Sequence, residues 1–137
     1  MTFHYDVPGD DLSQAGHATA DMKKKLQQLG ISTAVIKRTA VAMYEAEINM
    51  VVHAGGGVAD IDINDSGIDI VMADHGPGIP DIEQAMQEGW STAPESAHEL
   101  GFGAGMGLPN IKRNSDNLKI ESTVGVGTTV SIHIDIV

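Results

Sequence analysis

Two neighbouring segments of alternating apolar and polar residues constrain the fold more than any other feature of the chain. The segments "VADIDIN" (58–64) and "GIDIVMA" (67–73) both alternate with a period of two. This period is typical of strands that bury one face and expose the other. Only "DS" separates them before Gly67, a connection typical of a tight β-hairpin. The chain is therefore expected to hold an antiparallel sheet with one covered face.

Helical periodicity and turn residues predict the other elements around this hairpin. Asp10 or Asp11 is the expected cap of a first helix that ends at Gly30, and Ser32 is the expected N-cap of a second. The predicted elements are a strand at 2–7, helices at about 10–29, 32–54, 81–87 and 105–115, and strands at 118–123 and 128–136. This order predicts an α/β (α+β) two-layer sandwich, a mostly antiparallel mixed sheet with helices on one face, in a single domain over 1–137.

The composition argues against several classes of protein. The 42% hydrophobic and 20% charged residues are typical of a soluble globular chain. No apolar run reaches the roughly 18 residues of a membrane helix, and the polar start is unlike a signal peptide. The absence of cysteine fits a reducing cytoplasm, and the net charge of −11 argues against a nucleic-acid partner. We therefore expect a cytoplasmic protein that binds neither membranes nor nucleic acid.

Eleven of the sixteen glycines fall at 55–57, 76–78, 101–107 and 125–127, and this clustering suggests a ligand site. In "GFGAGMG" (101–107) the alternating glycines lead into a helix, where exposed N–H groups can bind an anion. The segment fits neither the dinucleotide fingerprint nor the P-loop. The alternative interpretation is a flexible hinge.

The segment "ADHGPGIPD" (73–81) ends an alternating strand with Asp74. Gly76 and Gly78 allow the backbone to approach a ligand closely, and the carboxylate can accept a hydrogen bond from an exocyclic amine such as that of adenine. The alternative is an ordinary turn shaped by its two prolines. In "GVGTTV" (125–130), a tight turn leads into the last strand, and the hydroxyl of Thr128 could reach a base or a water.

The second predicted helix has a polar stripe. Glu45, Asn49 and His53 follow one another at spacings of four and therefore lie along one helix face. Such groups are costly to bury without partners, so the stripe is either a functional site or a solvated face opposite the core. Glu47 points roughly 200° away from Glu45 around the helix and is expected to be solvated.

In sequence order, these four motifs read E-x-x-x-N, D-x-G-x-G, G-x-G-x-G and G-T. Their combination resembles the ATP-binding fold shared by DNA gyrase, the ATP-driven heat-shock chaperone, histidine kinases and mismatch-repair ATPases, known as the Bergerat or GHKL fold. The short chain, with "EGWSTAPES" (88–96) before "GFGAGMGLPNIKRNSDNLKIESTVGVGTTV" (101–130), resembles the anti-sigma-factor serine/threonine kinases of bacterial partner-switching systems, particularly the stress-response switch kinases.

The resemblance implies ATP and Mg²⁺ as cofactors. By this resemblance Glu45 is the general base, Asn49 holds the metal, Asp74 reads adenine with support from Thr128, and residues 91–107 form a lid. The implied nucleotide-binding set is Asn49, His53, Asp74, Gly76, Gly78, Ile79, Gly101, Gly103, Ala104, Gly105, Met106, Gly107, Leu108 and Thr128. Histidine kinases usually carry asparagine where this chain has Glu45, and a carboxylate there fits deprotonation of a hydroxyl or water.

The resemblance also implies a protein substrate. The leading hypothesis is a protein serine/threonine kinase whose partners are a small antagonist protein and a sigma factor or other regulatory protein, with a homodimer left open. The alternatives are a non-catalytic, nucleotide-dependent binding module and an ATPase subunit of a larger assembly. Between Ser91 and Gly107 the lid has no Lys or Arg, so Lys112 and Arg113 are the nearest following cations, facing phosphates, partner or solvent. The glycine-rich segment 89–107 is expected to become ordered with nucleotide.

Overall fold

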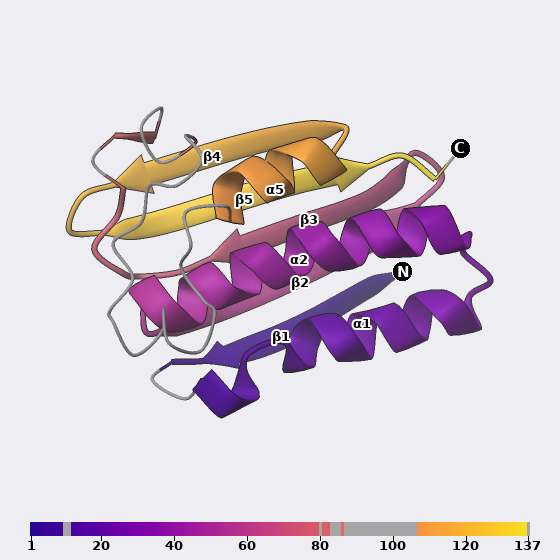
Figure 1. Ribbon diagram of the computed structural model, residues 1–137, viewed down its shortest axis with the longest axis horizontal. Helices are drawn as coiled ribbons and strands as arrows, with labels where there is room; N and C mark the ends of the chain where they lie inside the picture. The colour runs from indigo at the N-terminus through magenta and orange to yellow at the C-terminus, as the bar shows by residue number, and fades with distance from the viewer. Residues whose placement is uncertain (10–11, 80, 83–85, 87–106, 137) are drawn as a thin grey trace.

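The computed structural model describes residues 1–9, 12–79, 81–82, 86 and 107–136. Within these ranges five strands and three α-helices follow one another along the chain (Figure 1). They are β1 (Thr2–Pro8), α1 (His17–Gln28), α2 (Thr33–His53), β2 (Gly56–Asn64), β3 (Gly67–Ala73), α5 (Gly107–Asn114), β4 (Asn117–Thr123) and β5 (Gly127–Ile134), with a 3₁₀ turn at Leu12–Gln14.

The strands form one sheet in the order β1-β2-β3-β5-β4, with α1, α2 and α5 on one side of it (Figure 1). The predicted hairpin is confirmed, because Asn64 pairs with Gly67 where β2 turns into β3. The α+β class and the one-sided helical layer are confirmed as well. All four pairings between the described strands are antiparallel, so the parallel pairing that a mixed sheet implies does not occur among them.

The core lies between this sheet and the helices. Strand alternation directs every second side chain of β2, β3 and β5 toward α2, as the pattern predicted. Burying one such side chain contributes about 1.5–3 kcal/mol relative to exposing it. The fully buried apolar side chains include Met22, Leu26, Met43, Ile61, Ile68, Ile70, Met72, Ile111, Ile132 and Ile134.

Helix α2 matches its prediction closely. Its N-cap is Ser32, whose side-chain oxygen accepts a hydrogen bond from the Val35 N–H at 3.3 Å. The helix ends at His53, immediately before the first glycine cluster. Much of the helix is buried in the core, including Val35, Ile36, Met43 and Val51. No helix among the described residues is both long and apolar enough to cross a bilayer.

Helix α1 begins later than predicted. Its N-cap is Gly16, at a φ of +93° and with no side-chain cap, so the expected start at Asp10 or Asp11 is wrong. A left-handed residue does not continue a helix, and Gly16 therefore separates the 3₁₀ turn from α1. The missing cap comes from α2, where the carboxylate of Glu47 accepts hydrogen bonds from the first turn of α1.

The expectation that Glu47 is solvated is therefore also wrong. Glu47 is 1% exposed and is the only charged residue among the buried residues that the structure describes. Helical geometry did place it opposite Glu45, but that side of α2 is covered by α1 instead of solvent.

Two further predictions fall largely outside the described residues. Of the helix expected at 81–87, one helical hydrogen bond is described, from the Met86 N–H to the Ile82 carbonyl at 3.0 Å. Of the expected lid, 91–107, only Gly107 is described, as the first residue of α5.

Candidate nucleotide-binding site

The polar stripe of α2 lies at the border between core and surface. Glu45, Asn49 and His53 are all half-buried, so they belong neither to a fully solvated face nor to the closed core. Helix α5 lies beside α2 on the helical side of the sheet (Figure 1). Leu108, in the first turn of α5, was predicted to bind the nucleotide. Its side chain is buried, so we expect it to support the site only by packing.

Glu45 contacts α5 directly. Its Oε1 accepts a hydrogen bond from the Asn110 side-chain amide at 3.3 Å, and the Asn110 Oδ1 accepts one from the Arg113 guanidinium at 3.2 Å. Asn110 was not predicted as a site residue, because the sequence indicated only the helix that carries it. The contacts place an exposed arginine two hydrogen bonds away from the proposed base.

The structure brings Asp74 and Thr128 together. The Asp74 N–H donates to the Thr128 carbonyl at 2.9 Å, and the Thr128 N–H donates back to Asp74 Oδ1 at 3.1 Å. The same Oδ1 accepts from the Gly76 N–H at 2.9 Å. Oδ2 accepts no hydrogen bond from any residue that the structure describes. One oxygen of this half-buried carboxylate is thus fixed by backbone, and the other is available to a ligand.

Ser122 of β4 joins the two motifs and was missed by the sequence analysis. Its Oγ accepts a hydrogen bond from the Ile79 N–H at 2.7 Å and lies 2.8 Å from the Thr128 hydroxyl. Only one signal pointed to it, a polar residue at an inward-facing position of an alternating strand. Ile79 itself is half-buried and packs against the core.

Close packing explains why glycine occupies positions 76 and 78. A Cβ built on Gly76 would lie 2.5 Å from the Cβ of Ala54, at the end of α2. Gly78 has a φ of +81°, and a Cβ there would lie 2.5 Å from the Thr123 carbonyl oxygen. Both glycines therefore hold this loop tightly between α2 and the β4–β5 hairpin.

The free groups of the site fit ATP and magnesium. The Asn49 side chain makes no hydrogen bond with a described residue, so its amide oxygen can serve as a hard ligand of the kind Mg²⁺ accepts. No group of three or more His, Asp or Glu residues within the described ranges could hold a metal. Magnesium often uses one or two protein ligands and completes its coordination with phosphate oxygens and water.

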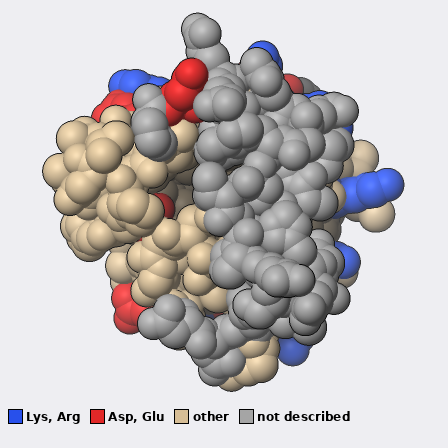
Figure 2. Space-filling model, turned by 60° about the vertical axis from the view of Figure 1, so that its left-hand side comes forward, with Lys and Arg blue, Asp and Glu red and all other residues tan. Residues whose placement is uncertain are grey.

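Five predicted residues cannot be placed, because Gly101, Gly103, Ala104, Gly105 and Met106 lie outside the described residues. Figure 2 shows the end of the molecule at which α2 ends and α5 begins. The described Lys and Arg side chains in that view lie at its edges and form no continuous patch.

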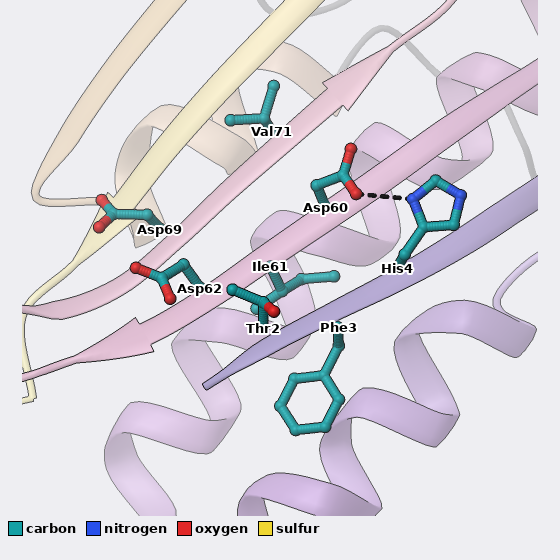
Figure 3. Close-up of a pocket in the computed structure, with 8 residues that line it drawn as sticks. All are labelled: Thr2, Phe3, His4, Asp60, Ile61, Asp62, Asp69 and Val71. Carbon is teal, nitrogen blue, oxygen red and sulfur yellow. Dashed lines mark hydrogen bonds and ion pairs between the residues drawn. The ribbon is translucent and has the colours of Figure 1, made fainter.

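A hollow of about 340 Å³ lies on the other face of the sheet, lined by Thr2, Phe3, His4, Asp60, Ile61, Asp62, Asp69 and Val71 (Figure 3). It shares no residue with the predicted site. The imidazole of His4 lies 2.6 Å from Asp60 and 3.2 Å from Asp6, and these hydrogen bonds raise the pKa of His4. We therefore assign this hollow no role in nucleotide binding.

Comparisons with known proteins agree with this geometry. The family described as "Histidine kinase-, DNA gyrase B-, and HSP90-like ATPase" matches residues 34–137, a range that contains every predicted site residue. The serine/threonine-protein kinase RsbT of Bacillus subtilis is 35% identical over 108 residues, which cover 76% of this chain and 75% of RsbT. The anti-sigma F factor of Pasteuria penetrans is 34% identical over 93 residues, 63% of this chain and 59% of that protein.

A solved structure shows the same fold. The crystal structure of the RsbU and RsbW domains of Rv1364c from Mycobacterium tuberculosis superposes with a TM-score of 0.66. The match covers 99% of this chain and 32% of that one, at 15% sequence identity.

Proposed function

Because the chain belongs to the family of histidine kinase-, DNA gyrase B- and HSP90-like ATPases, we propose that it is an ATP-dependent protein serine/threonine kinase. Its substrate would be a serine or threonine hydroxyl of a small antagonist protein in a partner-switching system. The observation that carries the proposal is a half-buried carboxylate, Glu45, one helical turn before Asn49 on the same face of α2.

Adenine recognition is assigned to Asp74. Its free Oδ2 can accept a hydrogen bond from the exocyclic amine of adenine, while Oδ1 stays bonded to the backbone of Gly76 and Thr128. Guanine offers a carbonyl oxygen at the corresponding ring position, which a carboxylate cannot hydrogen-bond. This site should therefore prefer ATP to GTP.

Phosphoryl transfer is assigned to Glu45. Its carboxylate would accept the proton of the substrate hydroxyl as that oxygen bonds to the γ-phosphorus and the bond to the β,γ-bridging oxygen breaks, which releases ADP. Asn49 would hold Mg²⁺, which neutralises phosphate charge when bound. Asn110 holds Oε1 of Glu45, so that the side chain is oriented before the substrate arrives.

Arg113 is the cation that the contacts bring closest to this arrangement, through Asn110. The sequence from 91 to 107 contains no Lys or Arg, so a positive charge from α5 would take the place of a lid cation. Arg113 is exposed, and in this proposal its positive charge acts on a phosphate or on a bound partner.

The names of the relatives suggest the partners. One relative is an anti-sigma F factor, so we include a sigma factor or another regulatory protein among the binding partners of this chain. We leave a homodimer as a further proposal, which light scattering at several protein concentrations would test.

The decisive experiment is incubation with γ-labelled ATP, Mg²⁺ and a candidate antagonist protein that carries an accessible serine or threonine. The proposal expects label on the antagonist and little free phosphate. Release of free phosphate alone would favour an ATPase subunit of a larger assembly. Nucleotide-dependent binding of the antagonist with neither product would favour a non-catalytic binding module.

A further inference from the structure

The buried carboxylate of Glu47 receives four hydrogen bonds from one short segment. Its Oε2 accepts from the N–H groups of Gly16 and Ala18 at 2.9 and 3.2 Å. Its Oε1 accepts from the N–H and the hydroxyl of Thr19 at 2.9 and 2.7 Å. We propose that Glu47 is a positioning residue, which fixes the rotation of α2 about its axis and thereby the direction in which Glu45 points.

Breaking the hydrogen bonds between Glu47 and the start of α1 would cost much free energy. A buried carboxylate that loses its partners is strongly destabilised, and all four donors here belong to residues 16–19. The first turn of α1 also places the positive end of the helix dipole at this carboxylate. Gly16 has no side chain to cap α1, so Glu47 is the cap. Neither helix can rotate away without leaving the carboxylate and the backbone N–H groups unpaired.

Glu45 and Glu47 lie on opposite sides of α2. Two residues correspond to roughly 200° around a helix, so Glu47 faces α1 while Glu45 faces Asn110 of α5. Side-chain tips lie about 5–6 Å from the helix axis, so a rotation of about 10° moves the Glu45 carboxylate by about 1 Å. A displacement of that size in a reacting group can lower a rate on the order of 10²-fold.

Helix α1 is in turn fixed to the edge strand β1. The Tyr5 hydroxyl donates to Asp21 at 2.6 Å and accepts from the Lys25 ammonium at 3.1 Å. Lys25 also forms an ion pair with Asp21 at 2.9 Å. Through Glu47, the orientation of α2, which carries the proposed base Glu45, therefore depends on α1 and on β1 at the edge of the sheet.

Three variants test the role of Glu47, which rests on the proposed function of Glu45. Glu47→Gln keeps the size of the side chain but replaces one accepting oxygen with an NH₂ group that faces N–H donors. Thr19→Val removes only the hydroxyl donor and serves as the milder variant if Glu47→Gln does not fold. Thr39→Val is the matched control, because Thr39 is equally buried on α2 but donates only within that helix, to the Val35 carbonyl at 2.8 Å.

Two readouts separate positioning from stability. The first is the rate of phosphate transfer at saturating ATP, compared with ATP affinity and the free energy of unfolding. The second is the ¹³C resonance of the Glu45 carboxyl group and its titration midpoint, which report the surroundings of Glu45 without any transfer. We expect Glu47→Gln to lower transfer at least about ten-fold and to shift the Glu45 signal. Thr39→Val should lower the free energy of unfolding but change neither the transfer rate nor the Glu45 resonance.

A Glu45 resonance that is unchanged in Glu47→Gln and Thr19→Val, with only stability lowered, would overturn the positioning role. If the wild-type protein transfers no phosphate, the kinase proposal fails, and the Glu45 resonance alone then decides the role of Glu47. The two failures are therefore distinguishable.

Discussion

At the scale of single residues, Asp74 serves the fold with one carboxylate oxygen and the proposed nucleotide site with the other. Oδ1 joins the end of β3 to the start of β5 through the N–H groups of Gly76 and Thr128. A substitution that removes the whole side chain would therefore mix structural and binding effects. Asparagine separates the two, because its amide oxygen can keep both backbone hydrogen bonds while its NH₂ group replaces Oδ2.

We expect Asp74→Asn to fold with near wild-type stability and to bind ATP at least about ten-fold more weakly. Losing one side of a buried donor–acceptor pair costs about 1–3 kcal/mol. Calorimetric titration with ATP and GTP, alongside thermal unfolding, measures both quantities. Equal affinity of the wild-type protein for ATP and GTP would remove the adenine assignment.

The contrast between Glu45 and Glu47 shows which residue positions could be predicted. The spacing of Glu45, Asn49 and His53 placed them correctly on one face of α2, because helical geometry is local. Whether the opposite face meets solvent or another helix is a tertiary property, and Glu47 was wrongly expected to be solvated for that reason. Asn110 and Ser122 were missed because each acquires its role only by contacting a distant motif.

At the scale of elements, periodicity and capping predicted α2 and all five strands to within about two residues. Those signals lie within each segment. The start of α1 was missed because its cap comes from α2, nearly thirty residues later in the chain. The position of β5 between β3 and β4 also could not be read from periodicity, because neighbouring strands in this sheet are not all consecutive in sequence.

The lid remains a prediction at this scale. We expect the amides of residues 91–105 to gain protection from hydrogen exchange with a non-hydrolysable ATP analogue, and less or none with ADP, as N–H groups close on the phosphates. Hydrogen-exchange mass spectrometry without ligand, with ADP and with the analogue measures this. The amides of β2 and β3 provide an internal control, since the sheet should exchange alike in all three. Equal protection of 91–105 in every state would contradict a nucleotide-dependent lid.

At the scale of the whole molecule, two histidines are held between carboxylates on the sheet face opposite α1, α2 and α5. His133 lies 2.6 Å from Asp69 and 2.9 Å from Asp135, and hydrogen bonding, chiefly to Asp69, raises its pKa above the ordinary value of 6.5. His4 has a raised pKa for the same reason, chiefly through Asp60. These contacts join β3 to β5 and β1 to β2 across directly paired positions.

The raised pKa values of His4 and His133 determine whether the free energy of unfolding rises or falls with pH. A histidine whose pKa is higher in the folded state stabilises the protein fully below 6.5, and this contribution is lost as pH rises through the folded pKa. We therefore expect the free energy of unfolding to fall as the pH rises from about 6.5 through the raised pKa values of the folded state. Urea unfolding across that range measures the slope, and the double variant His4→Gln/His133→Gln should flatten it. An unchanged slope in the double variant would refute the assignment.

The central claim is that Glu45 acts as the base in phosphate transfer while the rest of the site binds ATP. The most direct test is single-turnover transfer to the antagonist protein by wild type and Glu45→Gln, with ATP affinity measured in parallel. Glutamine keeps the size of the side chain and can still accept from Asn110, but it cannot take a proton at neutral pH. The account predicts a rate lower by roughly 10²–10⁴-fold with ATP affinity close to that of wild type. Transfer by Glu45→Gln at the wild-type rate would contradict it.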